Sequence, residues 1–214
     1  MTDDRGRGDE AGHDHALGMD AAIAHKVKAE LRKRLRGLRR TSTIEACRQR
    51  SEKIVAALLL REEIVRARTV ALFWPIEEKR EVDLCTLGDA LGARGVRLAY
   101  PTIDQDTRVM TFRFADYPPA LEERGMGFCE PHPDAEEARV LDVIVVPAIG
   151  VDPMGHRIGY GAGYYDRTLP RFCPPAIAIA VAFDYQLVME VPKGPHDVGV
   201  SVVVTDARVL DVPG

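Results

Sequence analysis

The sequence predicts an α/β fold, a three-layer sandwich in which helices cover both faces of a mainly parallel central sheet. Residues 143–146 and 177–181 are apolar at every position, as is typical of strands buried on both faces. Segments with helical spacing of apolar residues alternate with such runs, which is typical of α/β proteins. The chain of 214 residues is 46% hydrophobic and 29% charged, which suffices for one sizeable core.

The first segment, residues 1–24, is rich in glycine and charge. We predict that it is a disordered tail and that residues 25–214 form a single α/β domain. A helix begins this domain, because apolar residues recur every three or four positions and predict one face toward the core. The residues of that face are Val27, Leu31, Leu35 and Leu38.

A second helix is predicted from about residue 44 to 66, with Ile54, Ala57, Leu58 and Val65 among its buried positions. The strands predicted after it are 69–74, 96–100, 108–114, 140–147, 176–182 and 200–205, and the helical segments are 84–94, a helix from about 163, and 185–191. In such sheets ligands gather at the carboxyl ends of parallel strands. Glu81, Pro101 and the loop at 155–166 are expected there.

The loop at residues 155–166 is the most informative segment. Gly159, Gly161 and Gly163 allow backbone N–H groups to approach an anion closely, and a helix from about Gly163 would add its own N-terminal N–H groups. Asp166 falls in the first turn of that helix. A carboxylate beside a phosphate is repelled unless a cation intervenes, so Asp166 suits a magnesium ion. The alternative is a plain tight turn in which Asp166 only starts a helix.

Composition and motifs exclude several classes of function. A Rossmann loop would need glycine where Tyr164 stands, and the chain has no P-loop lysine motif. A net charge of -4 and a pI near 5.9 give no general attraction for nucleic acid or anionic membranes. No apolar stretch approaches the roughly 20 residues that cross a bilayer. Four scattered cysteines without a secretory signal predict reduced thiols in a cytoplasmic protein, and the histidines lack zinc-site spacing.

The first helix is strongly basic. It carries eight lysines and arginines between His25 and Arg40, against one glutamate. Lys28 and Arg32 are four residues apart and share a helical face, so both can point at one phosphate. A solvated face is the alternative, and we favour it for Lys33, Arg34 and Arg40. Binding of nucleic acid through this helix is a further alternative, although the acidic chain argues against it.

Several motifs occur in a characteristic order. They are K-A-E-L-R at 28–32, E-V-D at 81–83, Y-P at 100–101, G-F-C-E-P at 127–131, V-P-A-I-G-V-D at 146–152, the loop at 155–166 and H-D at 196–197. Together they resemble the 5-formyltetrahydrofolate cyclo-ligase family, also called 5,10-methenyltetrahydrofolate synthetases. The R-I-G-Y-G-A-G-Y-Y-D-R block is the most specific part, and the resemblance extends from about residue 26 to 206.

The resemblance implies an enzyme that uses ATP and Mg²⁺ to convert 5-formyltetrahydrofolate into 5,10-methenyltetrahydrofolate, with release of ADP and phosphate. The formyl oxygen would attack the terminal phosphate of ATP, and nitrogen 10 would capture the resulting iminium phosphate. Such a reaction depends on positioning and charge neutralisation and needs no covalent protein nucleophile. The partners would be these two small molecules, with neither nucleic acid nor membrane. We expect a monomer, with a homodimer as the alternative.

The resemblance also implies roles for individual residues. ATP would be bound by Lys28, Arg32 and Arg157 and by the backbone of Ile158, Gly159, Tyr160, Gly161, Ala162, Gly163, Tyr164 and Tyr165. The folate would be bound by Glu81, Pro101, Tyr160 and Tyr164, and magnesium by Asp166 and Asp197. Arg157 and Tyr164 are the expected catalytic residues, the latter by packing its ring over the formyl centre. As alternatives, Glu81 is a surface carboxylate, the tyrosines are core aromatics and Asp197 caps a turn.

Some positions depart from the commonest family pattern. Ala162 stands where many members carry lysine, Val151 replaces a frequent phenylalanine, and Ser201 replaces a frequent aspartate. The segment before Glu81 is longer than usual, so Glu78 is an alternative for its role. These departures leave open a paralogue that binds folate or nucleotide without this reaction.

Overall fold

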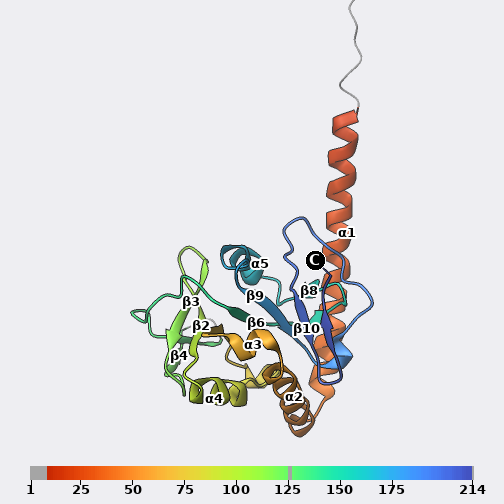
Figure 1. Ribbon diagram of the computed structural model, residues 1–214. Helices are drawn as coiled ribbons and strands as arrows, with labels where there is room; N and C mark the ends of the chain where they lie inside the picture. Colours follow the sequence, from red (N-terminus) through yellow and green to blue (C-terminus); the bar gives the residue numbers. More distant parts are fainter. Residues whose placement is uncertain (1–8, 125–126, 214) are drawn as a thin grey trace, which may run out of the picture.

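The computed structural model describes residues 9–124 and 127–213. Its centre is a seven-stranded sheet with the strand order β11-β10-β9-β6-β1-β2-β3 (Figure 1). The strands are β1 (Thr69–Ala71), β2 (Arg97–Ile103), β3 (Met110–Ala115), β6 (Val143–Pro147), β9 (Ile177–Val181), β10 (Val202–Val204) and β11 (Val209–Asp211). The five inner strands run parallel and the two edge strands pair antiparallel. This confirms the predicted mainly parallel sheet.

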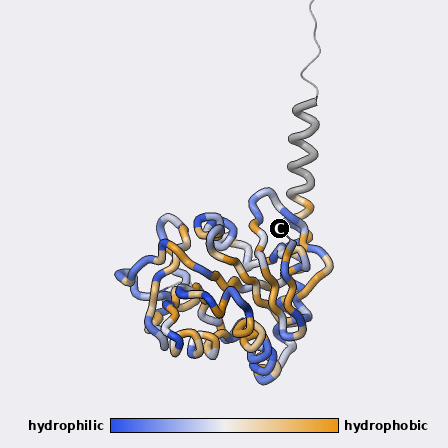
Figure 2. The backbone as a smooth tube through the Cα atoms, in the orientation of Figure 1, coloured by the Kyte–Doolittle hydropathy of each residue, from blue (hydrophilic) through white to orange (hydrophobic). Residues whose placement is uncertain are grey.

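Helices cover both faces of the sheet, as predicted. On one face lie α2 (Ile44–Leu59), α3 (Glu62–Arg66) and α4 (Cys85–Ala93), whose apolar side chains pack on residues such as Val143, Val145 and Ile179. On the other face α5 (Tyr164–Thr168) and the 3-10 turn η2 (Leu169–Arg171) pack on Ile144 and Val146. Figure 1 shows α5 above the sheet and α2 to α4 below it, and Figure 2 shows the hydrophobic residues concentrated along the inner strands.

The first helix, α1 (Asp9–Thr41), begins earlier than predicted. It includes residues 9–24, for which the composition predicts disorder, while residues 1–8 lie outside the described part of the chain. Residues 9–22 contain alanine and acidic residues without proline or a β-branched side chain, so only Gly12 and Gly18 strongly disfavour a helix there. Figure 1 shows α1 at the side of the sheet, extending beyond the rest of the fold. The division of the chain into a tail and one domain stays a prediction.

The buried face of α1 differs from the predicted apolar one. Leu35 is buried against Ile149, Ile158 and Val191, and Leu31 is partly buried, but Val27 and Leu38 are exposed. The predicted second helix is also interrupted after Leu59, and α3 follows it in a new phase. As a result Ile64 is fully buried and Val65 is 51% exposed, the reverse of the prediction for Val65.

Several short elements carry too few apolar residues to be predicted. They are the 3-10 turn η1 (Glu77–Lys79), the hairpin β4 (Leu121–Glu123) with β5 (Cys129–Pro131), the hairpin β7 (Gly150–Val151) with β8 (Arg157–Ile158), and β11. The helix predicted at 185–191 is reduced to the 3-10 turn η3 (Asp184–Gln186). Of these, the hairpin β7–β8 matters most, because it ends at residues 159–163, which we call the glycine loop.

Candidate active site

The glycine loop connects β8 to α5. Buried Asp152 holds the turn before it by accepting hydrogen bonds from the N–H groups of Met154 (2.9 Å), His156 (3.0 Å) and Val191 (2.8 Å). Gly161 has φ of 109° and Gly163 has φ of 66°, conformations that favour glycine because it has no Cβ. Since α5 has only five residues, its dipole is small, and the cationic side chains around the loop dominate the electrostatics.

The basic face of α1 lies directly on this loop. Arg32 Nε donates a hydrogen bond of 2.8 Å to the carbonyl of Gly159, and Lys28 forms an ion pair with Asp197. Burial, with repulsion from Arg36, lowers the pKa of Arg32. Lys28, Arg32 and the loop line one open cleft of about 690 Å³, which we call the cationic cleft. Its other polar lining groups are His25, Arg157, Asp166, Arg167, His196 and Asp197.

Arg157 is the most enclosed cation of the cleft, with a side chain only 3% exposed. Its Nη2 donates to Asp166 Oδ1 at 2.8 Å, whereas its Nε has no partner among the described residues. Burial lowers the pKa of this guanidinium, against the opposing effect of Asp166. A buried N–H donor without a partner is costly, and an anionic ligand in the cleft would remove that cost.

The two candidate metal ligands lie in the same cleft. Asp166 Oδ1 accepts from Arg157 and from the N–H of Val198 (3.2 Å), and Asp197 Oδ2 accepts from Lys28 and from the N–H of Gly194. Burial disfavours ionisation of Asp197, but the bonds from Lys28 and Gly194 outweigh it and hold its pKa below the usual value. Within the described residues the other oxygen of each carboxylate accepts no hydrogen bond, so each retains one ligand atom.

A second hollow of about 250 Å³ opens on the other side of the glycine loop, and we call it the aromatic cavity. Its lining includes Phe73, Trp74, Glu81, Pro101, Ile103, Met110, Phe128, Tyr160, Tyr164 and Tyr165. Glu81 is 8% exposed, while Glu78 is exposed on η1 and does not line the cavity. The structure therefore favours Glu81 over Glu78 as the carboxylate of this cavity.

The glycine loop is the wall between the cationic cleft and the aromatic cavity. Arg157, Gly159, Tyr160 and Gly163 line both. A phosphate on the cleft side and a ring in the cavity would therefore meet at these four residues. This arrangement suits transfer of a phosphoryl group between two bound substrates.

The remaining predicted residues are brought to the same place in different ways. The side chain of Ile158 is buried against α1, so only its backbone faces the cleft. The ring of Tyr165 lies 6.5 Å from that of Phe112 and 5.6 Å from the Arg157 guanidinium, and burial raises its pKa. Ala162 lines the aromatic cavity, while Ser201 lines neither hollow, so its lack of a carboxylate removes no lining group.

Three residues of the site were not predicted from the sequence. Trp74, at the end of the strand predicted at 69–74, and Phe128 line the aromatic cavity, but a single aromatic residue carries no periodic signal for a cavity. Arg39 is 5% exposed although it stands next to the predicted core residue Leu38. Its spacing of four from Leu35 and seven from Arg32 places it on the loop-facing side of α1, and that spacing was the available signal.

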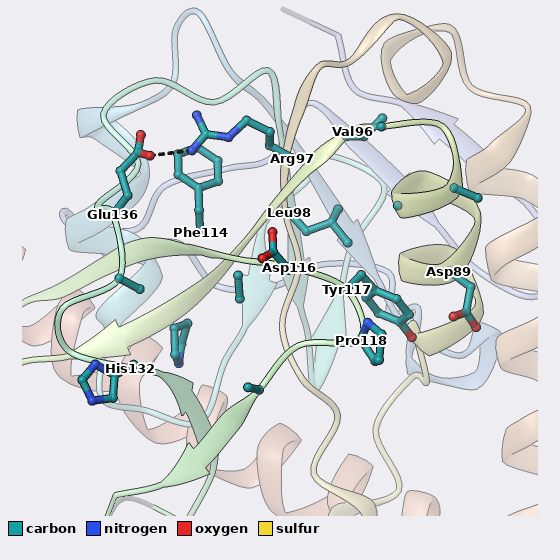
Figure 3. Close-up of a pocket in the computed structure, with 17 residues that line it drawn as sticks. Asp89, Val96, Arg97, Leu98, Phe114, Asp116, Tyr117, Pro118, His132 and Glu136 are labelled. Carbon is teal, nitrogen blue, oxygen red and sulfur yellow. Dashed lines mark hydrogen bonds and ion pairs between the residues drawn. The ribbon is translucent and has the colours of Figure 1, made fainter.

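A larger hollow, about 990 Å³, lies elsewhere, between α4, β2, β3 and the hairpin β4–β5. Figure 3 shows its Arg97 bonded to Glu136 and lying over the ring of Phe114. It contains none of the predicted site residues, and its other charged groups include Asp89 and Asp116. It brings together no constellation that suits the chemistry of the glycine loop.

The fold and the two joined hollows fit a class, an α/β enzyme with a glycine loop suited to an anionic group beside a cavity suited to a planar ring. The chain matches the family model of the 5-formyltetrahydrofolate cyclo-ligase family over residues 24–206. It belongs to this family, and is thus an ATP-dependent ligase of folate and one-carbon metabolism.

Individual relatives agree with this assignment. The chain is 36% identical to a 5-formyltetrahydrofolate cyclo-ligase of Mycolicibacterium smegmatis, over 87% of this chain and 97% of that protein. It is 28% identical to the Escherichia coli (strain K12) enzyme of the same name, over 83% and 99% of the two chains. The fold is similar to 5,10-methenyltetrahydrofolate synthetase of Aquifex aeolicus, with a TM-score of 0.77, 30% identity and coverage of 88% and 94%. The predicted family and activity are therefore confirmed.

Two further features are absent from the described residues. None of the helices in that part of the chain is long and apolar enough to cross a membrane. The same residues include no group of three or more histidine, cysteine, aspartate or glutamate side chains that could hold a metal ion alone.

Proposed function

We propose that the cyclo-ligase reaction of this chain takes place across the glycine loop, with the triphosphate of ATP in the cationic cleft and 5-formyltetrahydrofolate in the aromatic cavity. The observation that carries the proposal is the shared wall, in which Arg157, Gly159, Tyr160 and Gly163 line both hollows. At such a wall the terminal phosphate of one substrate can reach the formyl oxygen of the other.

On the ATP side, Lys28, Arg32 and Arg157 neutralise phosphate charge, and the backbone of residues 158–165 supplies N–H donors. Arg157 is suited to the transferred phosphate because its buried Nε has no partner among the described residues. Arg32 already bonds to the loop carbonyl at Gly159, so it also fixes the loop against α1. The three cations come from two segments that are far apart in sequence.

On the folate side, Glu81 accepts N–H bonds from the pterin, and Pro101 and Tyr160 form walls of the pocket. Tyr164 lies at the start of α5, next to Gly163 of the shared wall. Its ring is positioned to pack on the formyl group, where it keeps water from the reacting atoms. Arg157 and Tyr164 are therefore the residues that we assign to the chemical step.

The reaction is balanced by the two substrates themselves. The formyl oxygen attacks the terminal phosphorus of ATP, the bond between that phosphorus and ADP breaks, and the formyl group becomes an iminium phosphate. Nitrogen 10 then attacks that carbon and loses its proton, and phosphate leaves with the former formyl oxygen. The protein contributes orientation and fixed positive charge rather than a covalent bond.

Asp166 and Asp197 would hold Mg²⁺, each through the carboxylate oxygen that accepts no hydrogen bond within the described residues. Two carboxylates fit this ion, because Mg²⁺ in ATP-using enzymes takes its other ligands from phosphate oxygens and water. When bound, the ion would neutralise phosphate charge. Asp166→Asn should raise the Mg²⁺ concentration for half-maximal rate at least about tenfold, through loss of a charged ligand. Asp116→Asn, exposed in the distant hollow of Figure 3, is the matched control.

The reaction itself is tested by following the methenyl product by its absorbance and ADP by a coupled assay. Purified protein with 5-formyltetrahydrofolate, ATP and Mg²⁺ should release one ADP for each methenyl product formed. Omission of either substrate should stop both signals. ADP release without methenyl product, or no turnover at all, would contradict the proposed function.

We also propose that the chain acts in the cytoplasm as a monomer. The described residues include four cysteines that are all free, as expected in a reducing compartment. Both hollows are lined by this one chain, so a second copy is not needed to complete them. Cell fractionation tests the location, and sedimentation of the purified protein tests the monomer. A stable dimer that loses its cyclo-ligase activity on dissociation would contradict the monomer.

A further inference from the structure

A buried arginine on α1 is not accounted for by ATP binding. Arg39 is 5% exposed and does not line the cationic cleft. It lies one turn beyond Leu35 on the face of α1 that carries Arg32. Burying a guanidinium is costly unless it is paired and hydrogen-bonded, so its partners indicate its role.

Arg39 stands at the start of a chain of hydrogen bonds that ends in the aromatic cavity. Its Nη2 donates to the hydroxyl of Tyr160 at 2.8 Å, and that hydroxyl donates to Glu81 Oε1. The other oxygen, Oε2, accepts from the N–H of Ile76 at 2.9 Å. The chain links α1 and the glycine loop to the carboxylate that follows η1.

These bonds fix how Glu81 can bind a ligand. A carboxylate has about four acceptor positions, two on each oxygen. Tyr160 occupies one on Oε1 and Ile76 occupies one on Oε2, which leaves one on each oxygen. A pair of N–H groups on a planar ring needs such a pair of acceptors, held without rotation of the carboxylate.

The chemistry of the three groups fixes the direction of the bonds, because a guanidinium only donates and a carboxylate only accepts. Lys79 Nζ lies 4.7 Å from its ring centroid, and the guanidinium carbons of Arg36 and Arg39 lie at 5.7 and 5.9 Å. Burial of the hydroxyl and the neighbouring Glu81 raise the pKa of Tyr160. The phenol therefore keeps its proton near neutral pH, so it donates to Glu81 and accepts from Arg39.

We propose that Arg39 is a positioning residue for folate binding, which acts through the Tyr160 hydroxyl to fix the Glu81 carboxylate in the aromatic cavity. This rests on the proposed function, because it takes Glu81 as the ligand of the pterin. A merely structural Arg39 would tie α1 to the loop and would affect both substrates alike. A positioning Arg39 affects the KM of the folate alone.

The test is a double-mutant cycle with Arg39→Met and Tyr160→Phe, assayed for the KM of each substrate. Each single variant should raise the KM for 5-formyltetrahydrofolate about tenfold, as expected for one charge-assisted bond, with kcat and the KM for ATP within about twofold. Because both changes break the same chain, the double variant should also show about tenfold rather than about 100-fold. Arg40→Met, an exposed neighbour on α1, is the control and should behave as wild type.

Arg39→Lys keeps the charge and should recover part of the loss. If Arg39→Met does not fold, as judged by thermal unfolding, Arg39→Lys replaces it in the cycle. Additive effects in the double variant, an equal rise of both KM values, or a wild-type folate KM in Arg39→Met would each overturn the inference while leaving the proposed function intact. A wild-type protein without turnover would overturn the proposed function and this inference with it.

Discussion

Replacement of Lys28 by methionine tests the contribution of α1 to ATP binding. Lys28 is partly buried, with a side chain 13% exposed, and is paired with Asp197 across the cleft. Methionine keeps the length and helix propensity of the side chain but removes the charge. We therefore expect the fold to persist and the interaction with phosphate to be lost.

The magnitude follows from the pairing. A hydrogen bond to a charged group contributes about 1.5–3 kcal/mol. Lys28 already shares its charge with Asp197 in the absence of ATP, so the loss should lie near the lower end, about 1.5–2 kcal/mol, which corresponds to about a 10- to 30-fold rise in the KM for ATP. The KM for 5-formyltetrahydrofolate should stay within about twofold, because Lys28 does not line the aromatic cavity.

The ATP assay is carried out at saturating Mg²⁺, so that a change in Mg²⁺ affinity at Asp166 and Asp197 does not contribute to the KM. Lys33→Met, an exposed lysine on another face of α1, is the control and should leave both KM values unchanged. Equal effects of Lys33→Met and Lys28→Met, or an unchanged KM for ATP in Lys28→Met, would refute the reasoning.

Three further predictions test other parts of the site. In steady-state assays Glu81→Gln should raise the KM for the folate at least about tenfold, through loss of a charged acceptor, whereas Glu78→Gln, at an exposed position, should not. The opposite result would assign the folate-binding role to Glu78. Gly161→Ala, at φ 109°, should cost about 1–3 kcal/mol of local strain and weaken ATP binding in calorimetry, whereas Gly37→Ala, with open space around it, should bind ATP normally. The pKa of Asp197 is held below its ordinary 3.8, so the stability that the ionised carboxylate contributes is complete above pH 3.8 and is lost as the pH falls further. Below pH 3.8 the stability of Asp197→Asn should therefore fall less steeply with pH than that of wild type. Identical acid-unfolding curves would contradict the pairing with Lys28.

The inner strands could be predicted because burial on both faces leaves a continuous apolar signal. Residues 143–146 and 177–181 show it, and both lie in strands of the sheet. The hairpin β7–β8 has no such signal, because it packs Ile158 on one side and presents Arg157 to the site on the other. The carboxylate of Asp152 accepts hydrogen bonds within this hairpin and from Val191, a residue that no local pattern connects to it.

The candidate site was predictable where a motif kept its residues close in sequence. The glycine loop and Asp166 are one continuous segment, and Lys28 and Arg32 share a helical face. Arg39 was not predictable by apolar periodicity, because the loop-facing side of α1 is itself half polar. Leu38 is exposed, whereas Arg39 is buried and donates a hydrogen bond to Tyr160.

The central claim is that the glycine loop and the basic face of α1 gather the triphosphate on one side of a wall, with the folate on the other. A crystal structure with a non-hydrolysable ATP analogue and 5-formyltetrahydrofolate tests it most directly. The terminal phosphate should contact Arg157 and the backbone of residues 159–163, with Lys28 and Arg32 on the other phosphates and the formyl group next to Tyr164. Phosphates bound away from α1, or in the hollow that contains Arg97 and Glu136, would contradict it.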